Sequence, residues 1–372
     1  MQFNEILNKA ISKGASDIHI SENDKIMLRI DGQLVDSGFP LPNHDDMLAF
    51  EHGIAGENVI SAFRKKGEMD FAVSIEGYVR LRCNFYRCLG RDSMSVRLLP
   101  EIIPTAEQLG LPKELVDLCD KAKGLILVTG ATGSGKSTTL AAMLDYINSK
   151  YCKHIVTLED PVEYIHQNRC AMIHHREIGN DTASFADGIR AVLRQDPDVI
   201  MVGEMRDLET IATAISAAES GHLVLATLHT SSAASSVDRI IDAFPGDEQH
   251  QIRIQLADTL LGIVSQTLVP QADGGRTAAF ELMLNSTAVQ SMIREGKTYQ
   301  LPSVIQTNKA NGMFFTDDYL VKLCRDNTIT LETALRYSGN RERVEEILCP
   351  KIEPEKNKIS LKGMLKHEDK SK

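Results

Sequence analysis

The chain has 372 residues, of which 42% are hydrophobic, and this length exceeds the size at which a single domain usually stops growing. We therefore expect two domains. The formal net charge of −10 argues against a broad nucleic-acid-binding surface, so no nucleic-acid partner is expected, although a basic channel within an assembly would not show in this total.

Seven cysteines are scattered singly, without the paired spacing of a zinc ribbon or the density of a disulfide scaffold. They indicate a reducing compartment. The N-terminus lacks a basic region followed by a long apolar one, and no window approaches roughly 18 consecutive apolar residues. We therefore expect a cytoplasmic protein whose contact with a membrane is peripheral or made through a partner.

Residues 1–99 are predicted to form a compact α+β domain. An apolar helical face comes first and is followed by alternating strand patterns. Asp-Gly at 31–32 and Glu-Gly at 76–77 lie between such strands and predict two hairpins. Arg82 falls on the polar face of the strand after the second turn, and a further strand carries Arg97.

Three prolines at positions 100, 104 and 112 interrupt a connection that cannot be a continuous helix or a central strand. We place the domain linker at residues 100–111. Prolines restrict the backbone there, while few regular hydrogen bonds hold such a segment to either domain. The connection is therefore expected to act as a hinge.

From residue 112 to residue 348, short apolar β runs alternate with helical segments, a pattern typical of a doubly wound parallel sheet. The apolar runs are Leu125–Val128, Ile155–Leu158, Val199–Val202 and Leu223–Leu228. Residues 332–348 predict a final helical segment with charged faces. Residues 349–372 have few large apolar side chains, so we expect a mobile tail.

A phosphate-binding loop lies between the first apolar run and a helix-prone segment, where the sequence reads Gly-Ala-Thr-Gly-Ser-Gly-Lys-Ser. The glycines let backbone N–H groups converge on phosphates, and the helix start favours negative charge. Lys136 should reach the β- and γ-phosphates of ATP, and the Ser137 hydroxyl should coordinate Mg²⁺. The alternative is a glycine-rich turn with a chance lysine. The expected nucleotide-binding residues of this loop are Gly130, Thr132, Gly133, Ser134, Gly135, Lys136, Ser137 and Thr138.

Two acidic clusters follow predicted strands, at the carboxyl ends where open α/β sheets bind ligands. The first runs from Glu159 to Glu163 and reads Glu-Asp-Pro-Val-Glu. It is either a solvated acidic turn or, beside a phosphate-binding loop, the source of the carboxylate that polarises the attacking water. The second ends a strand in Gly203-Glu204, where an acidic residue contacts Mg²⁺ or its water shell unless it is only a surface acid.

Histidines mark both ends of another predicted strand. His222 and His229 would lie roughly 20 Å apart on an extended chain, so they cannot jointly hold one ion. We expect His229 near the phosphates as a γ-phosphate sensor and His222 at an interface or at the edge of a subsite. A metal at His174 and His175 is disfavoured because adjacent side chains on a strand diverge.

In their order and spacing, these motifs resemble the secretion/traffic ATPases of type II secretion and type IV pili. Within that superfamily the chain is similar to the PilT/PilU-like type IV pilus retraction ATPases, from Gly14 to about residue 348. Residues 288–295 match a motif specific to that branch, with two departures at Gln290 and Ser291. The chain has neither the four-cysteine zinc insert nor the long N-terminal extension usual in assembly and secretion members.

The resemblance implies a homohexameric ring with an N-terminal PAS-like domain, a C-terminal RecA-like ATPase domain and ATP bound between them. It also implies that Glu163 is the catalytic carboxylate and that His222 and His229 form a His box. Arg82 and Arg97 match N-terminal-domain arginines that approach the γ-phosphate, with a solvated strand face as the alternative for Arg82. The implied catalytic residues are Glu163, Glu204, His229, Arg82 and Arg97, with Ser137 and Glu204 at Mg²⁺.

The leading functional hypothesis is a motor that couples ATP hydrolysis to pilus retraction and so to twitching motility. Its partners would be an inner-membrane pilus platform protein and the pilus machinery, with peripheral association at the inner membrane. A type II/type IV secretion or conjugation ATPase is the alternative within the superfamily. A small-molecule P-loop kinase would need a lid with clustered arginines, and a poorly hydrolysing regulatory ring is disfavoured because Glu163 and Glu204 are present.

Overall fold

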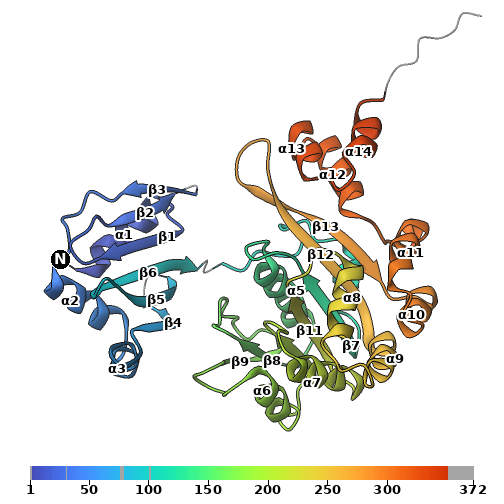
Figure 1. Cartoon of the computed structure of the whole chain (residues 1–372), viewed down its shortest axis with the longest axis horizontal. Coiled ribbons are helices and arrows are strands. Elements are labelled where there is room, and N and C mark those ends of the chain that lie inside the picture. The colour runs from blue at the N-terminus through green and yellow to red at the C-terminus, as the bar shows by residue number, and fades with distance from the viewer. Residues whose placement is uncertain (1, 31, 76–78, 100–101, 351–372) are drawn as a thin grey trace, which may run out of the picture.

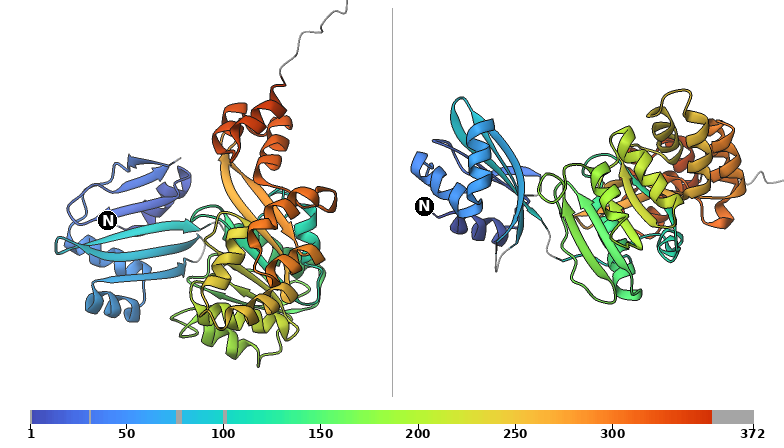
Figure 2. Two further views of the ribbon diagram at one scale, coloured as in Figure 1. Left: turned by 45° about the vertical axis from the view of Figure 1, so that its right-hand side comes forward. Right: turned by 90° about the horizontal axis from the view of Figure 1, so that it is seen from below.

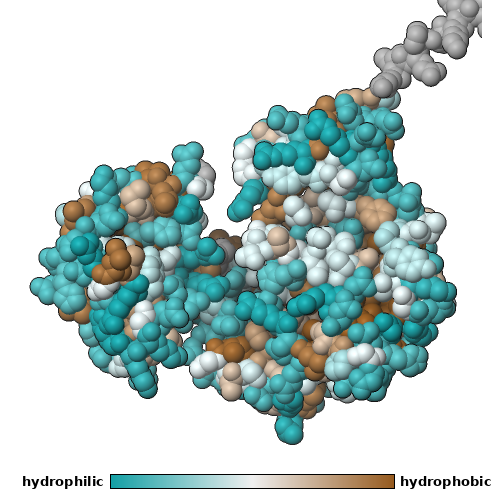
Figure 3. All heavy atoms as spheres, viewed as in Figure 1, coloured by the Kyte–Doolittle hydropathy of each residue, from teal (hydrophilic) through white to brown (hydrophobic). Residues whose placement is uncertain are grey.

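The computed structural model describes residues 2–30, 32–75, 79–99 and 102–350, which form an N-terminal half and a larger C-terminal half (Figure 1). Each half has its own sheet; the N-terminal half packs around one hydrophobic core and the C-terminal half around two. The two halves stand side by side in each view of Figure 2, and the space-filling surface is hollowed between them (Figure 3).

An antiparallel sheet in the order β3-β2-β1-β6-β5-β4 forms the N-terminal half. Its strands are β1 (Asp17–Ser21), β2 (Met27–Ile30), β3 (Gln33–Asp36), β4 (Glu68–Ser74), β5 (Arg80–Cys88) and β6 (Arg91–Leu99). Its helices are α1 (Phe3–Ser12), α2 (His44–Ile54) and α3 (Glu57–Lys66). Both predicted hairpins pair as antiparallel strands, while the turn residues 31 and 76–77 lie outside the described residues.

Side chains alternate across β5, and this alternation determines what each face of the N-terminal sheet can do. Leu81, Cys83 and Phe85 are buried in the core with the apolar residues of α1 and α2. Arg80 and Arg82 therefore lie on the opposite face, which carries no part of that core. The alternation thus leaves arginines free to contact the C-terminal half.

The C-terminal sheet has the order β13-β12-β7-β11-β10-β8-β9. Its strands are β7 (Gly124–Thr129), β8 (His154–Glu159), β9 (Met172–Glu177), β10 (Val199–Val202), β11 (Leu223–Leu228), β12 (Leu260–Pro270) and β13 (Arg276–Leu284). Neighbouring strands run parallel except β12 and β13. The four predicted runs all pair in parallel, and the antiparallel edge lies in β12 and β13, which were not predicted; residues 271–275 are too short a connection for anything but an antiparallel hairpin.

Helices cover both faces of this sheet and create two separate apolar cores. They are α4 (Lys113–Leu118), α5 (Lys136–Lys150), α6 (Phe185–Val192), α7 (Leu208–Glu219), α8 (Ala233–Asp242), α9 (Gln249–Thr259), α10 (Thr287–Arg294), α11 (Leu301–Thr307), α12 (Thr316–Arg325), α13 (Leu331–Tyr337) and α14 (Arg341–Leu348). In Figure 1, α12–α14 gather beside the β12–β13 hairpin.

The predicted final helix over 332–348 is in fact two helices, α13 and α14. The break occurs at Ser338-Gly339-Asn340, where the Asn340 side chain accepts a hydrogen bond from the Arg343 N–H and caps α14. Asp317 accepts the N–H groups of Gly339 and Asn340, which stabilises the turn. Residues 338–343 contain no apolar side chain, and this gap together with Gly339 was the usable signal of the break.

Residues 102–112 contain neither a helix nor a strand, as expected for the connection between the halves. Residues 100–101 and 351–372 lie outside the described residues, so the first linker proline and nearly all of the predicted tail do too. The exact domain limits and the hinge remain predictions. Within the described ranges, no helix is both long enough and apolar enough to cross a bilayer.

Candidate nucleotide site

The phosphate-binding loop joins β7, which is buried throughout, to the N-terminus of α5. Gly130, Gly133 and Gly135 all have positive φ, a conformation that L side chains rarely adopt. A Cβ at Gly130 would also collide with the Gln266 carbonyl oxygen and the Ser134 hydroxyl. The loop geometry therefore depends on glycine at this position.

Lys136 lies in the first turn of α5 with its ammonium group folded onto the loop. Its Nζ donates to the carbonyl oxygens of Gly130 at 2.9 Å and Ala131 at 3.0 Å. Burial lowers the pKa of Lys136, and the negative charges of Glu204 and Glu163 oppose this effect. The lysine is thus a cation held close to two carboxylates and available to a phosphate.

Glu204 follows β10 and is linked to Lys136 through His229, which follows the neighbouring strand β11. Its Oε1 lies 2.8 Å from His229 Nε2, and His229 Nδ1 lies 3.4 Å from Lys136 Nζ. Because the lysine can only donate, His229 accepts at Nδ1 and donates from Nε2 to Glu204. The same Glu204 oxygen is 2.6 Å from Arg206 Nε. These parallel strand ends therefore bring the predicted acid and the predicted sensor together.

Glu163 lies in the loop that follows β8, on the wall of the same cleft. The cleft has a volume of about 520 Å³, and its wall is formed by both halves of the chain. The Glu163 N–H points to Glu159 Oε2 at 3.4 Å, and Glu163 Oε1 lies 3.9 Å from Arg82. The sequence-predicted residues among its lining are Arg82, Arg97, Thr132, Gly133, Gly135, Lys136, Ser137, Thr138, Glu163, Glu204 and His229.

Arg97 reaches the cleft from β6 and also bonds to Asp17 of β1, with 2.9 Å between Nε and Oδ1. Burial would raise the pKa of Asp17, but hydrogen bonds from Ser16 and Arg97 outweigh it and hold that pKa below its ordinary value. The carboxylate is therefore ionised and fixes the orientation of the arginine. Arg82 is held in a similar way by Asp70 at 3.1 Å.

Oxygen donors suitable for Mg²⁺ surround the start of α5, namely the Ser137 hydroxyl and the carboxylates of Glu159 and Glu204. Within the described ranges, no group of three or more His, Cys, Asp or Glu side chains could hold a metal by itself. This donor set fits Mg²⁺ bound by one or two carboxylates together with substrate phosphates. Ser137 and Glu204 thus remain the predicted ligands, directly or through water.

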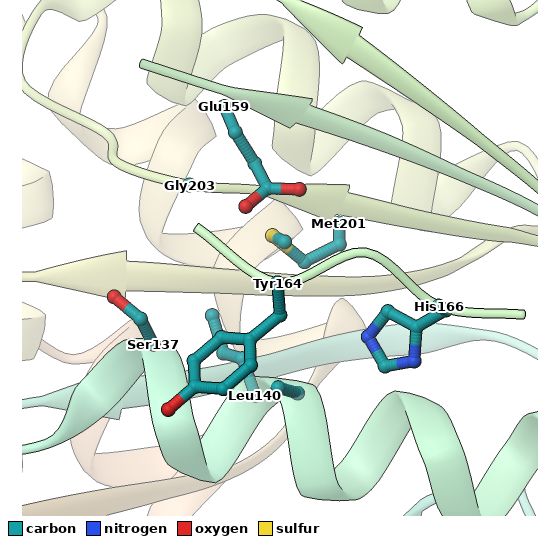
Figure 4. A pocket seen from close by; sticks show the side chains of 8 residues that line it. Ser137, Leu140, Glu159, Tyr164, His166, Met201 and Gly203 are labelled. Atoms are coloured by element: carbon teal, nitrogen blue, oxygen red, sulfur yellow. The ribbon is translucent and has the colours of Figure 1, made fainter. Parts of the chain in front are cut away.

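A second, much smaller cavity of about 30 Å³ lies between α5 and the segment that carries Tyr164 and His166 (Figure 4). Ser137 reaches it from α5 and Glu159 from the end of β8, while Tyr164 and His166 close it from the following loop. His166 is buried, its Nδ1 has no partner, and burial lowers the pKa of His166 to about 4. The histidine is therefore neutral near pH 7.

Some predicted site residues lie away from the cleft. His222 precedes β11 at the end opposite His229, and its Nδ1 contacts the Ala217 carbonyl oxygen at 2.9 Å. His174 and His175 have different partners, as the former contacts His154 at 3.0 Å and the latter Thr157 at 2.9 Å. Gly130 and Ser134 shape the loop without lining the cleft. The roles of His222, Gly130 and Ser134, like those of the residues that line the cleft, remain predictions, whereas no role was predicted for His174 and His175.

Several residues around the site were missed by sequence reasoning. Arg206 lies two positions after Glu204, and this nearness was the signal that could have found it. Arg276 lines the cleft from the start of β13, far from any recognised motif. The buried Gln266 on β12 accepts from Thr139 and donates to the Ser134 carbonyl oxygen, bracing the loop. Gln266 reaches the loop because strand β12 pairs with β7, and no short sequence motif indicates this pairing.

A glycine-shaped phosphate-binding loop after a buried parallel strand, with acids at the ends of neighbouring strands, defines a P-loop nucleotide-binding protein of RecA-like architecture. The family model described as "Type II/IV secretion system protein" matches residues 1–292, which is more than half of the chain. The chain therefore belongs to the type II/IV secretion system protein family.

Similar proteins extend this assignment along nearly the whole chain. The chain is 41% identical over 334 residues to the type IV pilus retraction ATPase PilT of Pseudomonas aeruginosa, covering 90% of this chain and 97% of that protein. It is 40% identical over 318 residues to a twitching motility protein of Neisseria gonorrhoeae, covering 85% of each. A crystal structure of the pilus retraction motor PilT with bound ADP matches with a TM-score of 0.86 at 43% identity, covering 93% of this chain and 99% of that one.

Proposed function

We propose that this chain is an ATPase that couples ATP hydrolysis to type IV pilus retraction. The observation that carries the proposal is the position of Glu163, on the wall of a cleft shared with the phosphate-binding loop and with an arginine from the N-terminal sheet. Similarity to pilus retraction and twitching motility proteins over 85% or more of the chain supports retraction over the secretion or conjugation alternative.

In the proposed reaction, backbone N–H groups of the loop and the Lys136 ammonium hold the phosphates of ATP. The Glu163 carboxylate accepts the proton of the attacking water, whose oxygen forms the new bond to the γ-phosphorus as the bond to ADP breaks. Mg²⁺, held by the Ser137 hydroxyl and by Glu204 directly or through water, would neutralise phosphate charge. Arg82 and Arg97 add positive charge from the N-terminal sheet, and His229 would relay the state of the phosphates to Glu204.

The proposed working form is a homohexamer, located in the cytoplasm and associated with the inner membrane through a pilus platform protein and the pilus machinery. Relatives with pilus functions, which cover 90% and 85% of this chain, support this setting. We expect ATP binding to favour one orientation of the two halves, because Arg82 and Arg97 would contact phosphates in that orientation alone. The connection around residues 100–111 would then serve as the hinge.

A cell-based complementation test separates retraction from secretion. The chain supplied to cells that lack their own pilus retraction ATPase should restore twitching motility, while the Glu163→Gln chain should leave the cells piliated and non-motile. Immunoblots of both chains control for expression. Failure of the unmodified chain to restore motility, with secretion restored in a strain lacking its secretion ATPase, would assign the chain to the alternative.

A further inference from the structure

Arg80 connects the N-terminal sheet to the loop that carries Glu163. It is the first residue of β5, and its half-buried side chain extends toward the loop after β8. Its Nε donates to the Val162 carbonyl oxygen at 2.8 Å, and its Nη2 lies 3.4 Å from Glu177 Oε2. One guanidinium therefore contacts two elements of the other half at once.

Glu177, the partner of Arg80, is the last residue of β9, the strand that pairs with β8. Its Oε2 also accepts the Val162 N–H at 3.1 Å. The two backbone groups of Val162 are thus held by opposite members of one ion pair, the carbonyl oxygen by Arg80 and the N–H by Glu177. Both charged side chains are largely shielded, with 17% and 11% of their surface exposed, where charge-assisted hydrogen bonds are strong.

The segment fixed in this way immediately precedes the candidate catalytic carboxylate. The Val162 side chain is itself buried, so the residue before Glu163 is held by packing as well as by hydrogen bonds. Arg82 faces Glu163 itself but holds it less firmly. Its Nη1 lies 3.9 Å from Glu163 Oε1, and its guanidinium also pairs with Asp70. The tight connection between the halves at this loop is therefore made by Arg80.

We propose that Arg80 is a positioning residue, which acts through Val162 and Glu177 to hold Glu163 in its reactive place. The inference rests on the proposed role of Glu163 in ATP hydrolysis. Because Arg80 belongs to the N-terminal sheet, a rotation of that half would displace the carboxylate along with its loop. A misplacement of about 1 Å can cost about 100-fold in rate, so this contact makes hydrolysis depend on the relative orientation of the two halves.

The test uses the full-length chain with Arg80→Ala and a matched control, Arg87→Ala. Arg87 lies on the same strand and pairs with Asp92 at 3.4 Å inside the N-terminal half, so the control loses an ion pair that does not reach the loop. Arg80→Ala should lower kcat about 10-fold or more while the Kd of a non-hydrolysable ATP analogue changes less than about twofold. Arg80→Lys should recover only part of the rate, since a single ammonium group cannot donate to the Val162 carbonyl oxygen and to Glu177 in the geometry of the guanidinium.

Amide hydrogen exchange provides a readout that does not depend on turnover. Peptides covering residues 160–165 should exchange faster in Arg80→Ala than in the unmodified chain. In Arg87→Ala the same peptides should exchange at the rate of the unmodified chain. Equal exchange in this segment for all three chains, or a kcat for Arg80→Ala equal to that of the control, would overturn the proposal.

A double-mutant cycle with Glu163→Gln separates this inference from the proposed function. If Arg80 acts through Glu163, adding Arg80→Ala to Glu163→Gln should lower the residual rate no further. If Arg80→Ala lowers the rate of the Glu163→Gln chain by the same factor as it lowers the rate of the unmodified chain, Arg80 does not act through Glu163. That result would contradict this inference but not the proposed function. An unmodified rate for Glu163→Gln itself would instead contradict the proposed role of Glu163.

Discussion

Arg82 on β5 lies directly opposite Arg97 on β6 in the antiparallel ladder, and both side chains line the cleft. Like charges in directly opposing positions destabilise a sheet. Each arginine is compensated by its own carboxylate, Asp70 for Arg82 and Asp17 for Arg97. Two adjacent cations beside a phosphate-binding loop would suit anionic phosphates, as the proposed role of both arginines requires.

Replacing either arginine by alanine should lower ATP hydrolysis about 10-fold or more, because phosphate charge would be less well stabilised. Stability should change by less than about 1 kcal/mol, since the two arginine side chains are 34% and 61% exposed and Ser16 still donates to Asp17 when Arg97 is replaced. Paired-label distances between the halves should also change less on addition of a non-hydrolysable ATP analogue. Arg91→Ala, on the exposed start of β6, is the control. The same nucleotide-dependent distance change in both variants as in the parent would exclude this coupling.

The sequence predicted four strands of the nucleotide-binding half, β7, β8, β10 and β11, because parallel strands buried on both faces read as continuous apolar runs. Leu125–Val128 and Val199–Val202 are of this kind, and the acids and His229 after such runs could be placed at one edge of the sheet. Strands β12 and β13 were both missed, although Asp273-Gly274 between two apolar runs was a usable hairpin signal.

Contacts between the two halves could not be predicted in the same way. The alternation along β5 places Arg80 on the same polar face as Arg82, but nothing in the local pattern identifies the Val162 carbonyl oxygen as its acceptor. Such a contact depends on how two separately folded sheets are oriented. Gln266 is a similar case, because its role follows from the docking of β12 beside β7.

Lys136→Ala should weaken nucleotide binding as well as turnover. Hydrogen bonds to charged groups are worth about 1.5–3 kcal/mol, which corresponds to a loss of affinity of about 10- to 100-fold. Lys150→Ala removes an exposed lysine at the other end of α5 and should leave affinity unchanged. Equilibrium binding of a fluorescent ADP analogue measures the effect, and equal affinities for the two variants would exclude Lys136 from phosphate binding.

The full chain should form a homohexamer, and hydrolysis should require its N-terminal half. A fragment of residues 112–372 retains the phosphate-binding loop but lacks Arg82 and Arg97, so it should bind nucleotide and hydrolyse it poorly. Light scattering measures the mass of each form, and a coupled assay measures phosphate release. A monomeric fragment with the full activity of the intact chain would contradict both expectations.

His166 should make the protein less stable under mildly acidic conditions. Its ordinary pKa of 6.5 is lowered to about 4 by burial, so the unfolded chain takes up a proton first as the pH falls. The contribution of His166 to the free energy of unfolding is fully present above pH 6.5, the pKa in the unfolded chain. It is lost as the pH falls toward about 4, the pKa in the folded chain, by about 2 kcal/mol between pH 7 and pH 5. Urea unfolding of His166→Gln should lack this part of the pH dependence, whereas the exposed His250→Gln should keep it. An equal pH dependence in the two variants would refute the assignment.

Glu163→Gln in the full-length chain tests the account most directly. The amide keeps the size of the side chain and spares the phosphate-binding loop, but it cannot accept the proton of the attacking water. We predict that ATP still binds with the affinity of the parent chain, while steady-state phosphate release falls by about 10²- to 10⁴-fold, the usual contribution of a general base. Phosphate release at the parent rate would show that Glu163 is not the catalytic carboxylate and would contradict the account.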